Sequence, residues 1–211
     1  MSVPVKPFPH QPEVDYLTEC RPQLRTGDIL MCSGSGLFSS MIQRGSDSVW
    51  SHVGLIVKLE EYNRVMLLES VEPAGVRAVR LSKYLDNYDN RGNPYPGGLI
   101  VARHRQFEHL VDETGRQQLV QFALDQFGYP YDKDQIARIS ARILARAINF
   151  SDEEYDRIKP DKEYLCSEYV DRCWRSVGVE VPLHAGGFIL PSDFARDDNI
   201  ELLAVLQAKH E

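Results

Sequence analysis

The sequence predicts an α+β fold in which an antiparallel sheet of short strands packs against helices. Short apolar runs bounded by turn residues fill residues 29–103, which is typical of strands. Amphipathic patterns with helical spacing dominate after residue 110, so strands and helices do not alternate as they do in an α/β protein. The chain has 211 residues, of which 43% are hydrophobic and 26% are charged, a composition typical of one globular domain.

The strand region begins after the turn at residues 25–28. Within residues 76–81 basic side chains are interspersed with apolar ones, which indicates a half-exposed strand. The patterns in this region predict an antiparallel meander of strands at 29–32, 50–57, 65–70, 76–81 and 99–103. Between them, short helical segments are expected at 37–43 and 83–88, and a final strand is expected at 200–206.

Three longer helices are predicted in the second half of the chain, over residues 112–127, 133–148 and 163–177. Gly128 and Pro130 end the first helix, and Gly178 ends the third. The second helix carries a stripe of basic side chains with a spacing of four residues: Arg138, Arg142 and Arg146. A solvated face explains this stripe most simply, and a lid that faces an anionic substrate is the alternative.

The domain organisation predicted from these patterns is an extended N-terminal arm at 1–21 and a single domain at 22–211, with a helical insertion at about 133–164. The arm has four prolines among its first 14 residues and no apolar stretch of the kind found in a secretory signal. A cytoplasmic location is therefore expected, with export by a non-classical route as an alternative. No apolar run approaches the roughly 20 residues that a membrane-spanning helix needs, so no integral membrane segment is expected.

The charge balance and the cysteines limit the expected partners. There are 31 acidic and 24 basic residues, a net charge of −7, so no nucleic-acid partner is expected. No pair of the four cysteines has the C-x-x-C spacing and no histidine cluster accompanies them, so neither a metal nor an organic cofactor is expected. The oligomeric state is left open by the sequence.

Cys166 is the cysteine whose position suggests chemistry. It lies near the start of the predicted helix 163–177, where unpaired N–H groups and the helix dipole favour a thiolate. A buried thiol of the core is the alternative, since free cysteines are among the most buried residues. The other three cysteines lack such a position and are assigned to packing or to the surface: Cys20, Cys32 and Cys173.

His52 and Glu69 are the residues that would complete a reactive site with Cys166. His52 begins an apolar strand, where a hydrogen-bonded neighbour of the core is the simpler interpretation. Glu69 ends another apolar strand, and a buried carboxylate is costly unless a partner such as a histidine satisfies it; a solvent-facing carboxylate is the alternative. Together the three residues supply the nucleophile, the base and the orienting group of thiol acyl transfer. Their order along the chain is His, Glu, Cys, whereas papain-like enzymes have the cysteine first.

Five segments carry a family resemblance, and they read LRTGDIL at 24–30, WSHVGLI at 50–56, GYPYD at 128–132, LCSEYV at 165–170 and PSDF at 191–194. In order and spacing they resemble the circularly permuted NlpC-type superfamily of cysteine peptidases, specifically its YiiX/YebB-like members, from about residue 22 to residue 206. The resemblance implies a permuted papain-like fold, a small antiparallel β-barrel or sheet packed against helices. It also implies the catalytic residues Cys166, His52 and Glu69.

The expected activity is that of a cysteine-dependent hydrolase or acyltransferase, which cleaves an amide or ester bond through a thioester on Cys166. A peptidoglycan-type peptide or an isopeptide is the favoured substrate. Tyr131, Ser51 and Ser167 are candidates for lining the substrate pocket or for stabilising the oxyanion. Two other functions stay open, a non-catalytic binding module on the same fold and a lipid acyl hydrolase or transferase, because a fold does not define a substrate.

Overall fold

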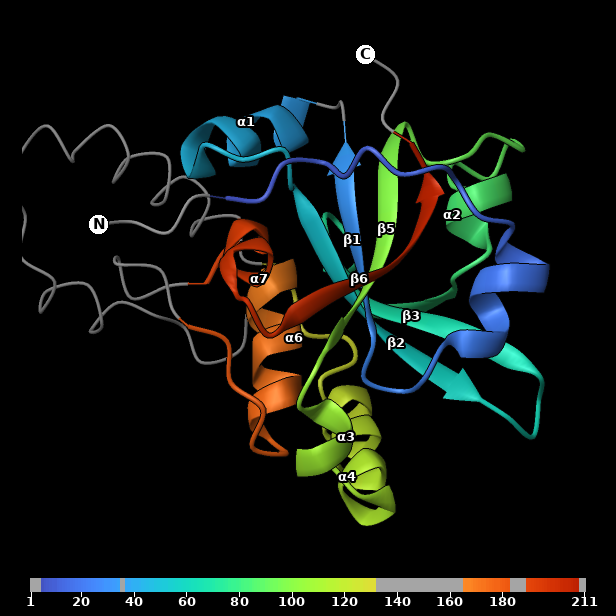
Figure 1. The fold of residues 1–211 in the computed structure, drawn as a ribbon, viewed down its shortest axis with the longest axis vertical. Helices are drawn as coiled ribbons and strands as arrows, with labels where there is room; N and C mark the ends of the chain where they lie inside the picture. The colour runs from blue at the N-terminus through green and yellow to red at the C-terminus, as the bar shows by residue number, and fades with distance from the viewer. Residues whose placement is uncertain (1–4, 35–36, 132–164, 183–188, 209–211) are drawn as a thin grey trace, which may run out of the picture.

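The computed structural model describes residues 5–34, 37–131, 165–182 and 189–208. Its centre is one six-stranded antiparallel sheet with the strand order β4-β3-β2-β1-β5-β6 (Figure 1). The strands are β1 (Ile29–Gly34), β2 (His52–Leu59), β3 (Arg64–Val71), β4 (Gly75–Arg80), β5 (Gly97–His104) and β6 (Ile200–Gln207). The sheet is open, with β4 and β6 as its edges, so a mixed α and β architecture is confirmed but a closed barrel is wrong.

The predicted meander holds for the first four strands and fails for the fifth. β1 to β4 each pair with the next strand, but β5 pairs with β1, on the side away from β2. Residues 81–96 therefore carry the chain past three strands, and β6 then pairs with β5 from the far end of the sequence. A short apolar run predicts a strand but does not encode the neighbour of that strand, and for this reason the position of β5 was not predictable.

Helices and turns cover both faces of the sheet (Figure 1). On one face lie α6 (Cys166–Arg175), α4 (Glu113–Asp125), α3 (Phe107–Leu110) and α7 (Pro191–Arg196), and on the other lie α2 (Lys83–Asp86), η1 (Tyr16–Cys20) and η2 (Arg21–Gln23). The remaining helix, α1 (Leu37–Ser46), follows β1. The predicted helices at 112–127 and 163–177 correspond to α4 and α6, whereas the predicted helix at 133–148 and its arginine stripe lie outside the described residues.

Two apolar cores result, one on each face of the sheet. Tyr169, Cys173 and Trp174 of α6 are fully buried against the first face. The indole Nε1 of Trp174 donates to the carbonyl of Gly27 at 3.1 Å, so the helix is also fastened by a polar contact. None of the described helices combines the length and the apolar character that a bilayer span needs.

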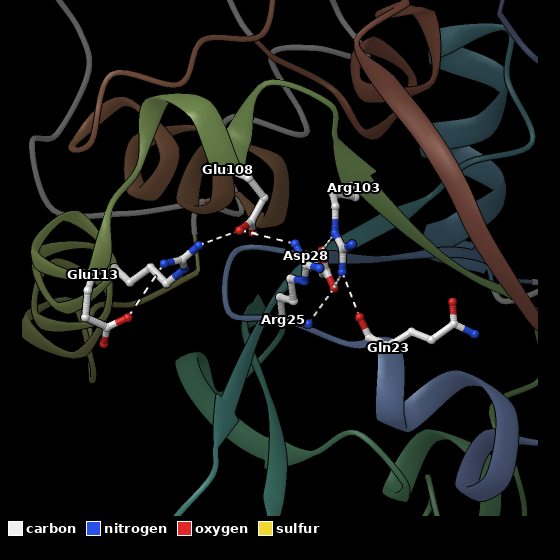
Figure 2. Close-up of polar contacts among 7 residues, drawn as sticks. Gln23, Arg25, Asp28, Arg103, Glu108 and Glu113 are labelled. Atoms are coloured by element: carbon white, nitrogen blue, oxygen red, sulfur yellow. Dashed lines mark hydrogen bonds and ion pairs between the residues drawn. The ribbon is translucent and has the colours of Figure 1, made fainter.

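The Gly-Asp element that precedes β1 is a structural clamp (Figure 2). Asp28 is buried and accepts from Nε of Arg103 at 2.6 Å, from its Nη2 at 2.8 Å and from the backbone N–H of Arg25 at 2.7 Å. Gly27 has a φ of +104°, and a Cβ there would lie 2.2 Å from the ring of Phe107. The element therefore joins the start of β1 to β5 and to α3.

The N-terminal segment lies against the domain. The carbonyl of Lys6 accepts from Nε1 of Trp50 at 3.2 Å, and the ring of Phe8 packs on Trp50 with a centroid separation of 5.4 Å. The N–H of Val14 donates to the carbonyl of Val205 in β6 at 2.9 Å. This contact occupies part of an edge strand that would otherwise present unpaired backbone groups.

Candidate active site

Cys166 is the first residue of α6. Leu165 before it is extended, with φ −72° and ψ 158°, so the helix begins at the cysteine itself. The residue is 2% exposed, and α6 packs across β2 and β3. The first N–H groups of a helix have no partner within the helix and carry a partial positive charge, which stabilises an anionic sulfur at this position.

His52 is the first residue of β2, at the end of that strand that meets the start of α6. Its side chain forms a hydrogen bond with the side chain of Cys166. Its Nε2 lies 2.8 Å from Oε2 of Glu69. Since Nε2 is engaged with the carboxylate, Nδ1 is the ring nitrogen left for the thiol. The structure thus brings together the three residues that the sequence singled out.

Glu69 lies in β3 and is completely buried. In addition to its contact with His52, Oε2 of Glu69 accepts from the hydroxyl of Tyr84 at 2.5 Å. Its Oε1 accepts from Nε of Arg77 at 3.1 Å and from Nη2 of Arg77 at 2.9 Å. Both carboxylate oxygens therefore have charged or strongly polar donors, which offsets the cost of burying the charge.

The charges in the site reinforce one another. Burial opposes the charged imidazolium, but attraction from Cys166 and Glu69 outweighs it and raises the pKa of His52 to about 10. Burial likewise opposes the charged form of Glu69, yet its bonds with His52, Tyr84 and Arg77 hold its pKa below the ordinary value. The raised pKa of His52 and the lowered pKa of Glu69 both favour the ion pair of imidazolium and carboxylate between these two residues.

A cluster of tyrosines supports the glutamate from the second face of the sheet. The ring of Tyr84 is nearly parallel to that of His52, with centroids 6.5 Å apart and an interplanar angle of 5°. Tyr88 and Tyr95 both pack against Tyr84, with centroid separations of 4.9 Å and 5.4 Å. Burial, and then the negative charge of Glu69, raise the pKa of the Tyr84 hydroxyl well above its ordinary value, so this group stays a donor.

The other three cysteines have no such setting. Cys32 of β1 is opposite His52 in the strand register, but it is fully buried, and burial followed by the charge of Glu69 raises its pKa well above the ordinary value. Burial raises the pKa of Cys20 and of Cys173 to about 12. All three thiols are buried among apolar neighbours, so their thiolates are disfavoured.

The hydroxyls of Ser51 and Ser167 contact the main chain. Ser51 Oγ accepts from the N–H of Gly34 at 3.0 Å and lies 3.3 Å from the carbonyl of Cys32. Ser167 Oγ donates to the carbonyl of Ile189 at 2.8 Å. These bonds position β2 and the start of α6, and the pocket role predicted for both residues stays a prediction.

Tyr131 is 6% exposed and ends a segment that runs beside the start of β4. Two residues before it, the carbonyl of Tyr129 accepts from the N–H of Val76 at 2.9 Å. A Cβ at Gly75 would lie 2.1 Å from that carbonyl oxygen, so only glycine permits this approach. The segment is thereby placed next to the strand that carries Arg77, and an oxyanion role for Tyr131 stays a prediction.

Sequence reasoning missed Arg77 and Tyr84, which contact Glu69 directly. A signal existed for Arg77, because it is a basic residue in the predicted strand 76–81, which follows the strand of Glu69 and pairs Arg77 with it. Nothing in the sequence marked Tyr84, which reaches the carboxylate from a four-residue helix beyond β4.

Comparisons with known proteins identify the family of the chain. Residues 23–203 match the family described as permuted papain-like amidase enzymes, YaeF/YiiX, C92 family. The crystal structure of the metalloprotein yiiX from Escherichia coli O157:H7 has a similar fold, with a TM-score of 0.52 and 23% sequence identity over 76% of this chain and 71% of that chain. No curated protein matches the chain. The resemblance seen in five short segments is therefore confirmed, and the chain belongs to the YaeF/YiiX family of permuted papain-like amidases.

Proposed function

We propose that the protein hydrolyses an amide bond with Cys166 as nucleophile, His52 as proton carrier and Glu69 as the group that orients the histidine. The observation that carries the proposal is the position of His52, which contacts Cys166 and, through Nε2 at 2.8 Å, Glu69. The family supports a cysteine amidase or peptidase, and an amide is accordingly preferred to an ester.

Acylation begins with the thiolate of Cys166. Its Sγ attacks the substrate carbonyl carbon, and the electron pair of the C=O bond moves to the oxygen. The backbone N–H of Cys166 is available to that oxygen because it is the first of an α-helix, and the Tyr131 hydroxyl is the second candidate donor. The oxyanion then collapses, the C–N bond breaks, and His52 gives the proton on Nδ1 to the leaving amine.

Deacylation uses the same groups in reverse. Neutral His52 takes a proton from a water molecule, whose oxygen attacks the thioester carbonyl carbon. Collapse of this second intermediate breaks the C–S bond, releases the carboxylic acid and restores the thiolate beside the imidazolium. If an amine or a hydroxyl takes the place of water, the same steps transfer the acyl group, which is how the enzyme would act as an acyltransferase.

We propose a peptide amide as the substrate, of the peptidoglycan or isopeptide type.

The similar structure belongs to a protein described as a metalloprotein. In the part of this chain that the structure describes, no group of three or more His, Cys, Asp or Glu side chains is arranged to hold a metal ion. The described His, Cys, Asp and Glu side chains therefore do not fit a metal site, and the proposed acylation and deacylation use only protein groups and water.

The experiment compares wild-type protein, Cys166→Ala and Cys173→Ala on a panel of muropeptides, isopeptide-linked peptides and acyl esters. Cys173 is a fully buried cysteine on the same helix and serves as the matched control. We expect turnover of at least one amide by wild-type protein and Cys173→Ala, and none by Cys166→Ala. Turnover that persists in Cys166→Ala would refute the thioester mechanism. Absence of both turnover and a covalent adduct in wild-type protein would favour a binding module instead.

A further inference from the structure

We propose that Arg77 is a positioning residue that tunes the pH range of the Cys166–His52 pair by acting through Glu69. The inference rests on the proposed function and adds to it a fourth functional residue on a strand that carries none of the other three. The guanidinium of Arg77 donates to Glu69, and Glu69 in turn contacts His52, so the influence of Arg77 on the chemistry passes through the carboxylate.

The geometry of the contact supports this role. Glu69 and Arg77 are direct partners in the register of β3 and β4, so their side chains leave the same face of the sheet. Two nitrogens of the guanidinium, Nε and Nη2, donate to the same oxygen, Oε1, at 3.1 Å and 2.9 Å. The other oxygen, Oε2, is left for His52 and Tyr84. Arg77 thereby fixes the rotation of the carboxylate that holds the imidazole.

Charged and titratable groups from several elements face Glu69. The charges of His52 and Arg77 lower the pKa of the carboxylate. The negative charge of the carboxylate in turn raises the pKa of neighbouring tyrosines and of a buried cysteine. Arg77 is the permanent cation in direct contact with it, because the imidazole of His52 loses its charge at high pH. Among the described residues these groups are His52 from β2, Arg77 from β4, Tyr84 from α2, Tyr88 beyond it, Cys32 from β1 and, through His52, Cys166 from α6.

The sign of the effect follows from the charge. A positive group favours the deprotonated form of every neighbour, so Arg77 lowers the pH at which Glu69 and, through it, the imidazolium lose their protons. Removing the charge should raise these titration midpoints together. The side chain of Arg77 is 37% exposed, so water and salt screen its field and the shift should be modest, roughly 0.5 to 1 pH unit.

A purely structural role makes a different prediction. Arg77 lies on an edge strand and is partly exposed, so a neutral side chain of similar length can occupy the same space. If Arg77 served only to pack β4, its loss would lower the rate of Cys166 alkylation by a similar factor at every pH. The pH midpoints of alkylation and of the His52 titration would then stay unchanged. The position of the midpoints therefore separates the two roles.

The experiment measures two quantities on the full chain between about pH 4 and about pH 11. The first is the rate of alkylation of Cys166 by iodoacetamide, and the second is the NMR titration of the His52 imidazole. The variants are Arg77→Met, Arg77→Gln and Arg77→Lys, and Arg80→Met is the matched control, since Arg80 is exposed on the same strand. Circular dichroism confirms that each variant is folded, and Arg77→Gln replaces Arg77→Met if the latter does not fold.

We expect the neutral variants to move the acid midpoint of alkylation and the midpoint of His52 upward, by roughly 0.5 to 1 unit, with Arg77→Lys close to wild type and Arg80→Met unchanged. Folded neutral variants whose midpoints match wild type would overturn the inference while leaving the proposed function intact. If wild-type Cys166 is not alkylated faster than Cys20, the proposed function itself fails, and the two failures are thus distinguishable.

Discussion

The Nε2 atom of His52 and the Oε2 atom of Glu69 lie 2.8 Å apart, although the first belongs to β2 and the second to β3. The pair connects a completely buried carboxylate to an imidazole that also forms a hydrogen bond with Cys166. Because the glutamate engages Nε2, Nδ1 is the ring nitrogen left for the thiol of Cys166. In the proposed mechanism, the reactivity of Cys166 therefore depends on Glu69 through His52.

Glu69→Gln should lower kcat/KM by about 10²- to 10⁴-fold, because an amide neither stabilises the imidazolium nor enforces its orientation. The amide also has one oxygen and one NH₂ group, so it cannot accept from His52, Tyr84 and Arg77 together. We therefore expect lower stability as well. Activity at several pH values and urea unfolding of the same preparation check the two effects. Unchanged turnover would remove Glu69 from the mechanism.

Tyr84→Phe should retain the fold and cost about 1.5 to 3 kcal/mol of unfolding free energy, the range for a hydrogen bond to a charged group. The loss arises because Oε2 of Glu69 keeps His52 but loses a donor in a buried site. Tyr88→Phe is the control, since the ring of Tyr88 packs in the same cluster. Equal denaturant midpoints for the two variants would argue against a special role for the Tyr84 hydroxyl.

The stability of the protein should fall as the pH rises toward the folded-state pKa of His52. This pKa is raised from the ordinary value of 6.5 to about 10, so the folded state binds the proton more tightly than the unfolded chain does. The stabilisation that comes from protonated His52 is fully present below pH 6.5 and is lost as the pH rises through about 10. Urea unfolding at a series of pH values tests this, and His52→Gln should show a flatter decline over the same interval.

Gly27→Ala should be strongly destabilising, whereas Gly92→Ala should be mild. Both glycines have a positive φ, +104° and +85°, so each alanine meets a similar backbone penalty. At Gly27 the new Cβ would also lie 2.2 Å from the Phe107 ring, whereas nothing lies within 4 Å of a Cβ at Gly92. Thermal unfolding compares them directly. A similar loss of Tm in both would show that the contact with Phe107 adapts at little cost.

Much of the fold was predictable because local patterns determine it. The apolar runs that became β1, β2 and β3 are flanked by turn residues, and Gly178 follows the last turn of α6. The pairing of β5 with β1 was not predictable, because it depends on contacts across the whole sheet rather than on the sequence of the strand.

The site was predictable to the extent that a single residue was unusual for its position. A carboxylate at the end of an apolar strand and a cysteine at the start of a helix each conflict with the simplest local interpretation. Arg77 looked like an ordinary basic residue of a half-exposed strand, and Tyr84 like an apolar residue of a short helix. Their function appears only when the folded sheet places them against Glu69.

The most direct test of the central claim is the competition of the four cysteines for iodoacetamide at about pH 6, followed by peptide mapping. Cys166 is the thiol that the proposed mechanism activates, at a helix start and beside His52, whereas the raised pKa values of Cys20, Cys32 and Cys173 keep those thiols protonated. We expect Cys166 to be labelled at least roughly 100-fold faster than the other three, and His52→Ala to remove this preference. Faster labelling of Cys20 or Cys173, or equal labelling of all four, would contradict it.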